Sequence, residues 1–339
     1  MLQQTQVKTV IPFWNRWMSE LPTIEAAASA PSAKIHKLWE GLGYYTRVRN
    51  LQKAAQQILA QHGGKFPEKF DEVLALSGIG RYTAGAICSI AFNQPTPILD
   101  GNVIRVLTRV FGIAENPKEK ETNAHLWALA EELVKEGRDS APRGPDAAAR
   151  RPYQNQTCSH LNQSLMELGA LICTPRGPQC RRCPVQTLCV AFKEGRTGEL
   201  PNLGKRAAAT ARRFVAFVIE RNGRFLVRQR PAGVVNAHLW EFPNVEVGTK
   251  ICDPLEIFAE FDTLRVVEPR SAKLEPLCTV KHSITRYRIT LEAFKVSLKQ
   301  SPANKDGVWK TPAQLSALAF SSAHKKLASA AAKSILSDR

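Results

Sequence analysis

Four cysteines, separated by six, two and five residues, stand in the run Cys173-Thr-Pro-Arg-Gly-Pro-Gln-Cys-Arg-Arg-Cys-Pro-Val-Gln-Thr-Leu-Cys189. They are Cys173, Cys180, Cys183 and Cys189. Four thiolates on one short, proline-stiffened loop can converge on a single metal centre without a large core beneath them. The spacing favours a cubic [4Fe–4S] cluster, and we expect these four residues to hold it.

Zinc and disulfides are the alternatives for this loop. Structural zinc usually takes two Cys-x-x-Cys pairs, and here only Cys180 and Cys183 have that spacing. Two disulfides are disfavoured because the N-terminus carries no secretory signal. The remaining cysteines also stand singly along the chain, at Cys88, Cys158, Cys252 and Cys278.

The composition is that of a soluble globular protein, and its charge makes nucleic acid the expected partner. The 339 residues suffice for two or three domains, and no uninterrupted apolar stretch approaches the ~18 residues of a membrane span. Lys and Arg number 47 against 30 Asp and Glu, a net charge of +17. Such a charge attracts a polyanion and supplies affinity for phosphates, although a basic surface kept for solubility is the alternative. We expect a cytoplasmic, nucleoid-associated bacterial protein with no membrane partner.

Residues 1–195 have the pattern of a helical region. Leu51 to His62 places its apolar residues on one helix face, and Gly63-Gly64 follows as a stop signal. Similar spacing recurs at 87–92, 103–110, 126–134 and 161–172. The segment of about 137–160 is polar, rich in Pro, Arg and Ala, and without periodicity, which predicts an insertion loop.

The pattern changes after a basic linker at 196–213, which carries Arg196, Lys205, Arg206, Arg212 and Arg213. Two strands flank an Asn222-Gly223 turn, at 214–219 and 225–228. A further strand is expected at 287–294 and a final Ala-rich helix after His324. Residues 214–339 are therefore predicted to form an α+β domain.

A Gly-x-Gly turn opens the run Leu76-Ser-Gly-Ile-Gly-Arg-Tyr-Thr-Ala-Gly-Ala-Ile87. Gly78 and Gly80 let the backbone turn tightly, so that the N–H groups at the next helix start face outward and can hold a DNA phosphate. This is a helix-hairpin-helix pattern. A plain connection between two helices is the alternative, because Gly-x-Gly alone is a weak signal.

Five motifs stand in one order: Met1-Leu-Gln-Gln-Thr-Gln-Val, Trp39-Glu-Gly-Leu-Gly-Tyr-Tyr, the hairpin, Leu99-Asp-Gly-Asn-Val and the cysteine loop. By these motifs the chain resembles an adenine DNA glycosylase of the MutY type, in the endonuclease III-like superfamily. The likeness covers residues 1 to about 200, and extends more loosely beyond them through Leu239-Trp-Glu-Phe-Pro243. It implies a base excision repair enzyme that flips adenine out of a mispair with 8-oxoguanine or guanine and hydrolyses its glycosidic bond.

The resemblance also implies the architecture. We expect an all-α helix-hairpin-helix glycosylase core with a [4Fe–4S] cluster loop over 1–195, in which the hairpin is 76–87 and the cluster loop is 173–189. The linker 196–213 would then lead to a C-terminal α+β Nudix-like domain at 214–339 that recognises 8-oxoguanine. We expect a monomer that acts on double-stranded DNA and whose cleft between two lobes holds Asp100.

Tyr82 and Asp100 are the expected catalytic residues. Bifunctional relatives carry a lysine nucleophile where this chain has Tyr82, and a Schiff base needs an amine, so a monofunctional glycosylase is predicted. By resemblance Tyr82 also makes a polar contact near the reacting sugar, and the alternative is an aromatic residue packed at a helix start. Asp100 matches the family's catalytic aspartate, whose charge opposes the positive charge left on the deoxyribose. The alternative is a cap for a helix that begins near Asn102.

Three further positions match base-handling residues of the family. Gln4 and Tyr44 match residues wedged into the duplex when the base leaves the stack. Gln163 matches a position that hydrogen-bonds adenine. A core-packed tyrosine and a solvated helix glutamine are the alternatives for Tyr44 and Gln163.

Two departures from the family pattern stand out. Members read Glu-Val-Met-Leu-Gln-Gln-Thr, where the glutamate protonates the leaving adenine, and this sequence begins at the methionine of that motif. Without the general acid we expect excision to be ~10²–10⁴-fold slower, unless the start codon is misplaced. A non-catalytic mispair-binding protein is one alternative function, and a bifunctional glycosylase resembling endonuclease III is the other.

The second departure lies in the C-terminal domain. No Nudix box of carboxylates occurs between Phe214 and Arg339, which disfavours nucleotide hydrolysis. Where many members carry Phe-Ser-His, this chain has Ile284, Thr285 and Arg286. Thr285 and Arg286 are the candidates for contacting 8-oxoguanine. A simple exposed hairpin is the alternative.

Overall fold

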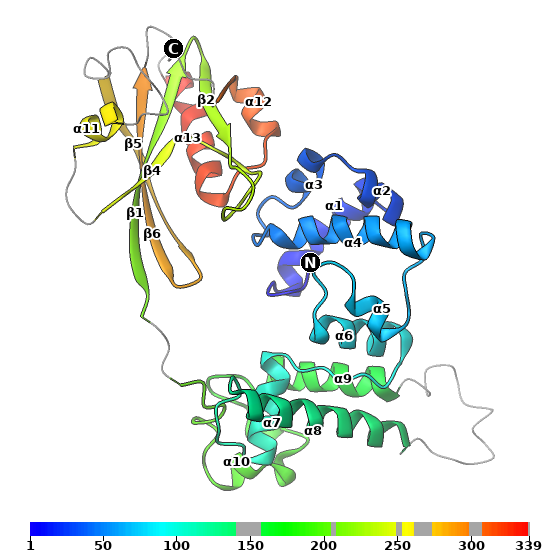
Figure 1. Cartoon of the computed structure of the whole chain (residues 1–339). Helices are drawn as coiled ribbons and strands as arrows, with labels where there is room; N and C mark the ends of the chain where they lie inside the picture. The colour runs from blue at the N-terminus through cyan, green and yellow to red at the C-terminus, as the bar shows by residue number, and fades with distance from the viewer. Residues whose placement is uncertain (140–156, 205–207, 249–252, 261–272, 298–306, 338–339) are drawn as a thin grey trace. The chain divides into compact units, whose positions relative to one another are not determined.

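The computed structural model describes residues 1–139, 157–204, 208–248, 253–260, 273–297 and 307–337 (Figure 1). The chain divides into two compact units. One unit comprises Met1–Gln56 with Ala207–Arg339, and the other comprises Gln57–Arg206. Within the described ranges, none of the helices has the length and apolar character that crossing a membrane requires.

The first unit begins with helices, and it contains a packed pair of tryptophans. They are α1 (Val7–Glu20), α2 (Ile24–Ser29), α3 (Ser32–Leu38) and α4 (Thr46–His62). The ring of Trp17 meets that of Trp39 edge-on at 6.0 Å, a favoured geometry for two indoles. The helix predicted over 51–62 is confirmed, and Gly63 and Gly64 follow it with φ of +59° and +79°.

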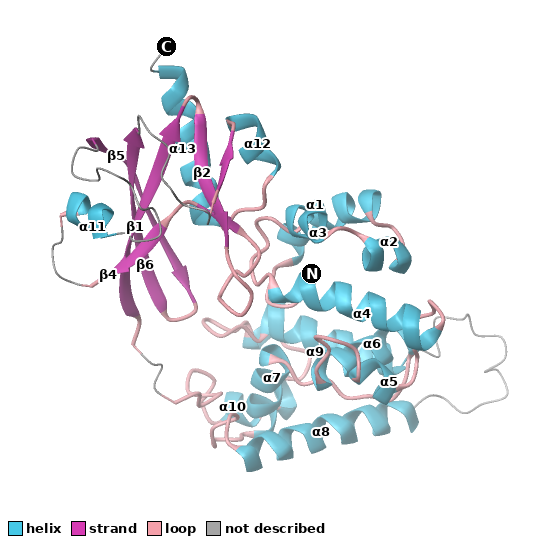
Figure 2. Cartoon of the chain, turned by 45° about the horizontal axis from the view of Figure 1, so that its top comes forward, coloured by secondary structure: helices cyan, strands magenta, loops and turns pink. Residues whose placement is uncertain are grey.

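All strands of the described residues lie between Thr210 and Lys310 (Figure 2). They are β1 (Thr210–Arg221), β2 (Arg224–Gln229), β3 (Trp240–Glu241), β4 (Asn244–Val247), β5 (Lys273–Ile284), β6 (Tyr287–Ser297) and β7 (Val308–Lys310). The order is β3-β2-β1-β6-β5, with β4 on β1 and β7 on β2. Only the β1–β6 pair is parallel among these. The predicted Asn-Gly hairpin joins β1 to β2, and β1 starts at Thr210, inside the segment predicted as a linker.

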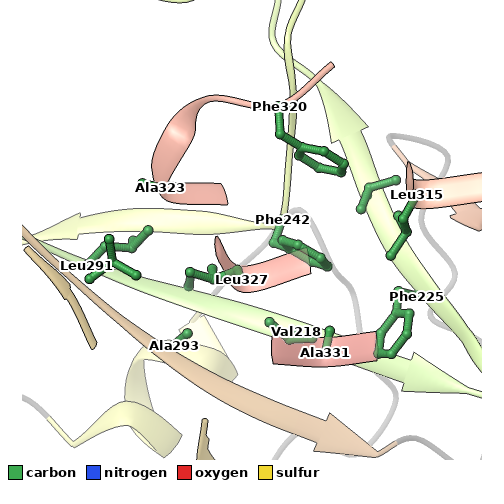
Figure 3. Close-up of a cluster of buried hydrophobic side chains, with 13 residues drawn as sticks. Val218, Phe225, Phe242, Leu291, Ala293, Leu315, Phe320, Ala323, Leu327 and Ala331 are labelled. Atoms are coloured by element: carbon green, nitrogen blue, oxygen red, sulfur yellow. The ribbon is translucent and has the colours of Figure 1, made fainter. Parts of the chain in front are cut away.

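The sheet buries apolar side chains on both faces because successive residues of β1 point in opposite directions. Ala216 and Val218 belong to one core, which includes residues of α12 (Pro312–Ala317) and α13 (Ser322–Ser337) (Figure 3). Val215 and Phe217 belong to the other core, with Phe258 of α11 (Pro254–Glu260). The final helix is therefore confirmed, although it begins at Ser322.

The second unit is helical. It contains the end of α4, then α5 (Phe70–Leu74), α6 (Arg81–Phe92), α7 (Gly101–Phe111), α8 (Lys120–Asp139), α9 (Thr157–Glu167) and α10 (Val190–Lys193). The helix predicted over 161–172 ends as α-helix at Glu167 and continues as a π-helical segment, Leu168–Ile172.

The insertion loop predicted over about 137–160 is wrong at both ends. Residues 137–139 continue α8 and residues 157–160 begin α9, because the backbone hydrogen bonds of a helix continue where the apolar pattern fades. The middle of that segment lies outside the described residues.

Buried His324 makes the C-terminal domain sensitive to acid. Its Nδ1 accepts a hydrogen bond from Phe242 N at 3.2 Å, and burial lowers the pKa of His324 to about 4. In the unfolded chain this imidazole binds a proton near pH 6.5, whereas in the folded protein it does so only near pH 4. The stability of the fold therefore falls as the pH drops from 6.5 through about 4. Between pH 7 and 4.5 the free energy of unfolding falls by about 2–3 kcal/mol through this group.

Urea unfolding of the full chain and of His324→Asn, compared at pH 7 and pH 4.5, checks this prediction. Asn keeps an acceptor for Phe242 N but does not titrate, so the variant should lose less stability on acidification. Equal losses in both proteins would contradict it.

Candidate active site and nucleic-acid interface

Asp100 is held at the start of α7 by three donors. One carboxylate oxygen accepts from Asn102 N at 3.0 Å and Val103 N at 2.8 Å, and the other accepts from Asn102 Nδ2 at 3.3 Å. The helix start also carries partial positive charge, which favours a carboxylate there. The predicted cap is confirmed, and the side chain, half-buried, has a defined orientation.

Tyr82 is close enough to Asp100 for the charge of the carboxylate to act on its phenol. It is the second residue of α6, and its hydroxyl donates to Met166 Sδ at 3.5 Å. Burial raises the pKa of Tyr82, and the charge of Asp100 raises it further. Tyr82 is partly buried against the core that contains Leu99 and Val103. The charge of Asp100 therefore reaches Tyr82, and the phenol stays protonated at neutral pH.

Helix α6 closely approaches the segment before Asp100. A Cβ on Gly85 would lie 2.2 Å from Pro97 O, so only glycine fits there. Thr96 Oγ1 donates to Gly85 O at 2.9 Å, and Thr96 O accepts from Asn162 Nδ2 of α9 at 3.0 Å. Sequence analysis missed Gly85 and Asn162. The small run Ala84-Gly85-Ala86 was the available signal.

Two buried arginines of α7 face the cysteine loop. Arg105 is 8% exposed and donates to the carbonyl oxygens of Gly169 and Cys173, each at 2.6 Å. Arg109 is 2% exposed and donates to the carbonyl oxygens of Thr174 at 2.9 Å and Leu200 at 2.8 Å. The helix that starts at Asp100 is thereby joined to the cysteine loop by side-chain hydrogen bonds. Sequence analysis also missed this pair.

The four cysteines of the loop line one pocket, bordered also by Arg109 and by apolar residues of α7. Burial raises the pKa of the Cys180 thiol, and the charges of the other three cysteines raise it further. All four are free thiols, which disfavours the two predicted alternative disulfides. In the part of the chain that the structure describes, no three His, Cys, Asp or Glu side chains can share one metal ion.

The predicted hairpin precedes α6. Gly78 has φ of +79°, in the left-handed region that favours glycine, and Gly80 caps α6 without a side chain. A Cβ on Gly80 would meet nothing within 4 Å, so its surface is open. The first N–H groups of α6 receive no side-chain hydrogen bond from the cap, as a phosphate-binding helix start requires.

Arg47 joins the two segments that carry the predicted wedge residues. Gln4 and Tyr44 are both exposed, Tyr44 by 54%. The Arg47 guanidinium lies 5.7 Å from the Tyr44 ring centre. It donates to oxygens on both sides, namely those of Met1, Gln3, Thr5, Leu42 and Gly43. One side chain therefore fixes both loops.

Left-handed backbone marks three of the predicted DNA-contacting residues. Gln4, Tyr44 and Thr285 have φ of +56°, +46° and +52°. Apart from glycine and asparagine, only His238 shares this conformation among the described residues. Such backbone costs of order 1–3 kcal/mol and tends to persist at functional sites.

The remaining predicted contacts lie on a hairpin and on α9. Thr285 and Arg286 form the two-residue turn between β5 and β6, and both side chains are exposed. Arg286 lies over the ring of Tyr287 at 5.2 Å. Gln163 is exposed on α9, and its amide donates to Ser159 Oγ at 3.0 Å. One unit thus holds Asp100, Tyr82, Gln163, the hairpin and the cysteine loop, and the other holds Gln4, Tyr44, Thr285 and Arg286.

Comparison with known families matches both parts of the chain. Residues 1–132 match the HhH-GPD superfamily of base excision DNA repair proteins, and residues 214–330 match the NUDIX domain. These matches confirm the predicted helix-hairpin-helix core and the Nudix-like C-terminal domain.

Curated relatives extend the likeness over nearly the whole chain. The chain is 34% identical to the adenine DNA glycosylase of Mus musculus, covering 96% of this chain and 69% of the relative. It is 33% identical to that of Homo sapiens, covering 96% and 66%. Identity to the adenine DNA glycosylase of Buchnera aphidicola subsp. Schizaphis graminum is 34%, covering 76% and 68%.

Substitution of Arg47 should loosen both wedge segments together. Arg47→Lys keeps the charge but has no planar fork to reach both loops, so amide exchange in residues 2–5 and 42–45 should rise about tenfold or more. Hydrogen exchange followed by mass spectrometry measures this. Arg16→Lys is the matched control, since Arg16 NH2 donates to Leu38 O at 3.2 Å. Faster exchange in only one of the two segments would contradict the proposed link.

Proposed function

The chain belongs to the adenine DNA glycosylase family, and we propose that it removes adenine paired with 8-oxoguanine or guanine in double-stranded DNA, as a monofunctional enzyme. Members of this family are hydrolases that act on N-glycosyl bonds. The observation that carries the proposal is the Asp100 carboxylate, which three donors at the start of α7 orient.

Asp100 suits the chemistry of the bond that breaks. When adenine leaves, positive charge develops on the deoxyribose, and a fixed carboxylate stabilises this charge without reorganising. Because Asp100 is already hydrogen-bonded to the start of α7, its orientation costs nothing further during the reaction. The neutral hydroxyl of Tyr82 can donate a hydrogen bond but cannot form a Schiff base, so strand cleavage by the endonuclease III-like alternative is disfavoured.

The proposed DNA contacts follow from the exposure of these side chains and from their backbone conformation. The open start of α6 after Gly78 and Gly80 would hold a phosphate. Gln4 and Tyr44 would fill the gap left by the flipped base, since both are exposed on strained loops. Thr285 and Arg286 would contact 8-oxoguanine from the tip of the β5–β6 hairpin, and the exposed Gln163 would meet adenine through its amide.

We infer that Cys173, Cys180, Cys183 and Cys189 hold a [4Fe–4S] cluster. The four free thiols line one pocket, and their spacing along the chain suits a [4Fe–4S] cluster better than structural zinc, which usually takes two Cys-x-x-Cys pairs. Bound there, the cluster would brace the loop through four thiolate bonds. The NH1 group of Arg109 lies 3.3 Å from Cys173 Sγ and can stabilise its thiolate.

Metal analysis tests the cluster. Chain purified without oxygen should be brown and contain about four irons. Cys183→Ser should lower the iron content and the melting temperature, because one ligand is lost. Cys278→Ser, on strand β5, should change neither, so it serves as the control. Stoichiometric zinc without iron would contradict the inference.

Asp100→Asn tests the catalytic role. Asn keeps an acceptor for the α7 backbone but loses the charge, so duplex affinity should remain while adenine excision falls by about 10²-fold or more. Single-turnover excision from a duplex with 8-oxoguanine opposite adenine measures this, with Asp71→Asn on α5 as the charge-matched control. Excision at the parent's rate would show that Asp100 is not the catalytic carboxylate.

A further inference from the structure

Glu40 is a buried carboxylate whose donors come from both ends of the chain. Its side chain is 5% exposed. One oxygen accepts from Phe320 N at 3.0 Å, and the other accepts from Lys325 Nζ at 2.7 Å and from Lys37 Nζ at 2.9 Å. Phe320 and Lys325 follow Glu40 by 280 and 285 residues and belong to the same compact unit.

The segment around Phe320 is held at several points. Its carbonyl oxygen accepts from Tyr45 OH at 3.3 Å, and Lys37 Nζ also donates to Leu318 O at 2.9 Å. The Phe320 ring stacks on Phe242 at 5.9 Å inside the core of the C-terminal domain. Lys37, Glu40 and Tyr45 therefore bind a backbone segment that is anchored in that core.

The loop between Glu40 and Tyr45 is internally braced. Gly41 N donates to Tyr45 OH at 3.2 Å, and Trp39 Nε1 donates to Gly43 O at 3.1 Å. Tyr44, the proposed wedge, lies within this loop and points out to solvent. Glu40 and Tyr45, at the two ends of the loop, both hydrogen-bond the backbone of Phe320. These bonds fix the position of Tyr44 relative to the C-terminal domain.

Burial makes this contact specific. A carboxylate removed from water is costly unless hydrogen-bond donors compensate its charge, and here three donors, two of them ammonium groups, do so. Burial raises the pKa of Glu40, but the hydrogen bonds from Lys325, Phe320 N and Lys37 outweigh it, so the pKa lies below its usual range. Removing the carboxylate leaves those donors without their acceptor.

We propose that Glu40 is a positioning residue that fixes the Tyr44 loop to the domain carrying Thr285 and Arg286. Tyr44 and the two residues proposed to contact 8-oxoguanine can then bind one duplex at a fixed spacing. The roles of Tyr44, Thr285 and Arg286 rest on the proposed function. The docking itself rests only on the contacts that Glu40, Lys37 and Tyr45 make with residues 318–325. Loss of Glu40 should lower the preference for 8-oxoguanine while leaving affinity for matched DNA intact.

Two measurements on the full chain separate docking from recognition. The first is hydrogen exchange of residues 39–45 and 318–325 without DNA. The second is the ratio of dissociation constants for a duplex with 8-oxoguanine opposite adenine and the same duplex fully matched. The variants are Glu40→Ala and the milder Lys325→Gln, and Glu25→Gln is the control because Glu25 is exposed on α2.

Glu40→Ala should speed exchange in both segments and reduce the dissociation-constant ratio, each by about tenfold or more, and Lys325→Gln should do so less. Unchanged exchange would overturn the docking. Faster exchange with an unchanged ratio would overturn the positioning role. If the parent itself shows no preference for 8-oxoguanine, the proposed function fails, and the exchange arm alone decides whether Glu40 docks the two segments.

Discussion

Two guanidinium groups on α7 must find acceptors inside the protein, and the structure of the second unit depends on how they do so. Buried charges persist only when hydrogen-bonded, and Arg105 and Arg109 reach carbonyl oxygens at Gly169, Cys173 and Thr174. A Cβ on Gly169 would lie 2.7 Å from the Cβ of Asn102, so glycine is needed for the loop to come this near. The same helix carries Asp100 at its start. The hydrogen bonds of Arg105 and Arg109 to the cysteine loop therefore fix the direction of α7 and the position of Asp100.

Local signals in the sequence predicted the elements well. Apolar periodicity indicated α4 and α7, and Asn222-Gly223 indicated the β1–β2 hairpin, because each pattern reports a hydrogen-bonded unit of neighbouring residues. The ends of α8 and α9 were misjudged, since polar residues extend a helix without any apolar pattern. The roles assigned to Asp100, Tyr82 and Gln163 came from resemblance, and they stay predictions.

Contacts between distant residues could not be predicted. Nothing in the motif around Glu40 indicates that its donors stand near position 320, because burial of a carboxylate follows from the assembled fold. Arg47 likewise resembles any exposed arginine of a basic helix, yet it fills the space between two loops that carry exposed side chains. Charged residues give no periodic signal when the fold buries them, so the side chains that position the candidate site were the ones missed.

The left-handed backbone at Gln4, Tyr44 and Thr285 sets folding stability against the proposed function of these residues. Glycine adopts this conformation freely, whereas these residues are strained by about 1 kcal/mol or more each. A redesign guided by thermal stability would therefore favour glycine or asparagine at all three places. Such a protein would melt at a higher temperature and lack the groups that we propose meet the duplex, so these three positions are the ones that stabilising mutagenesis has to leave untouched.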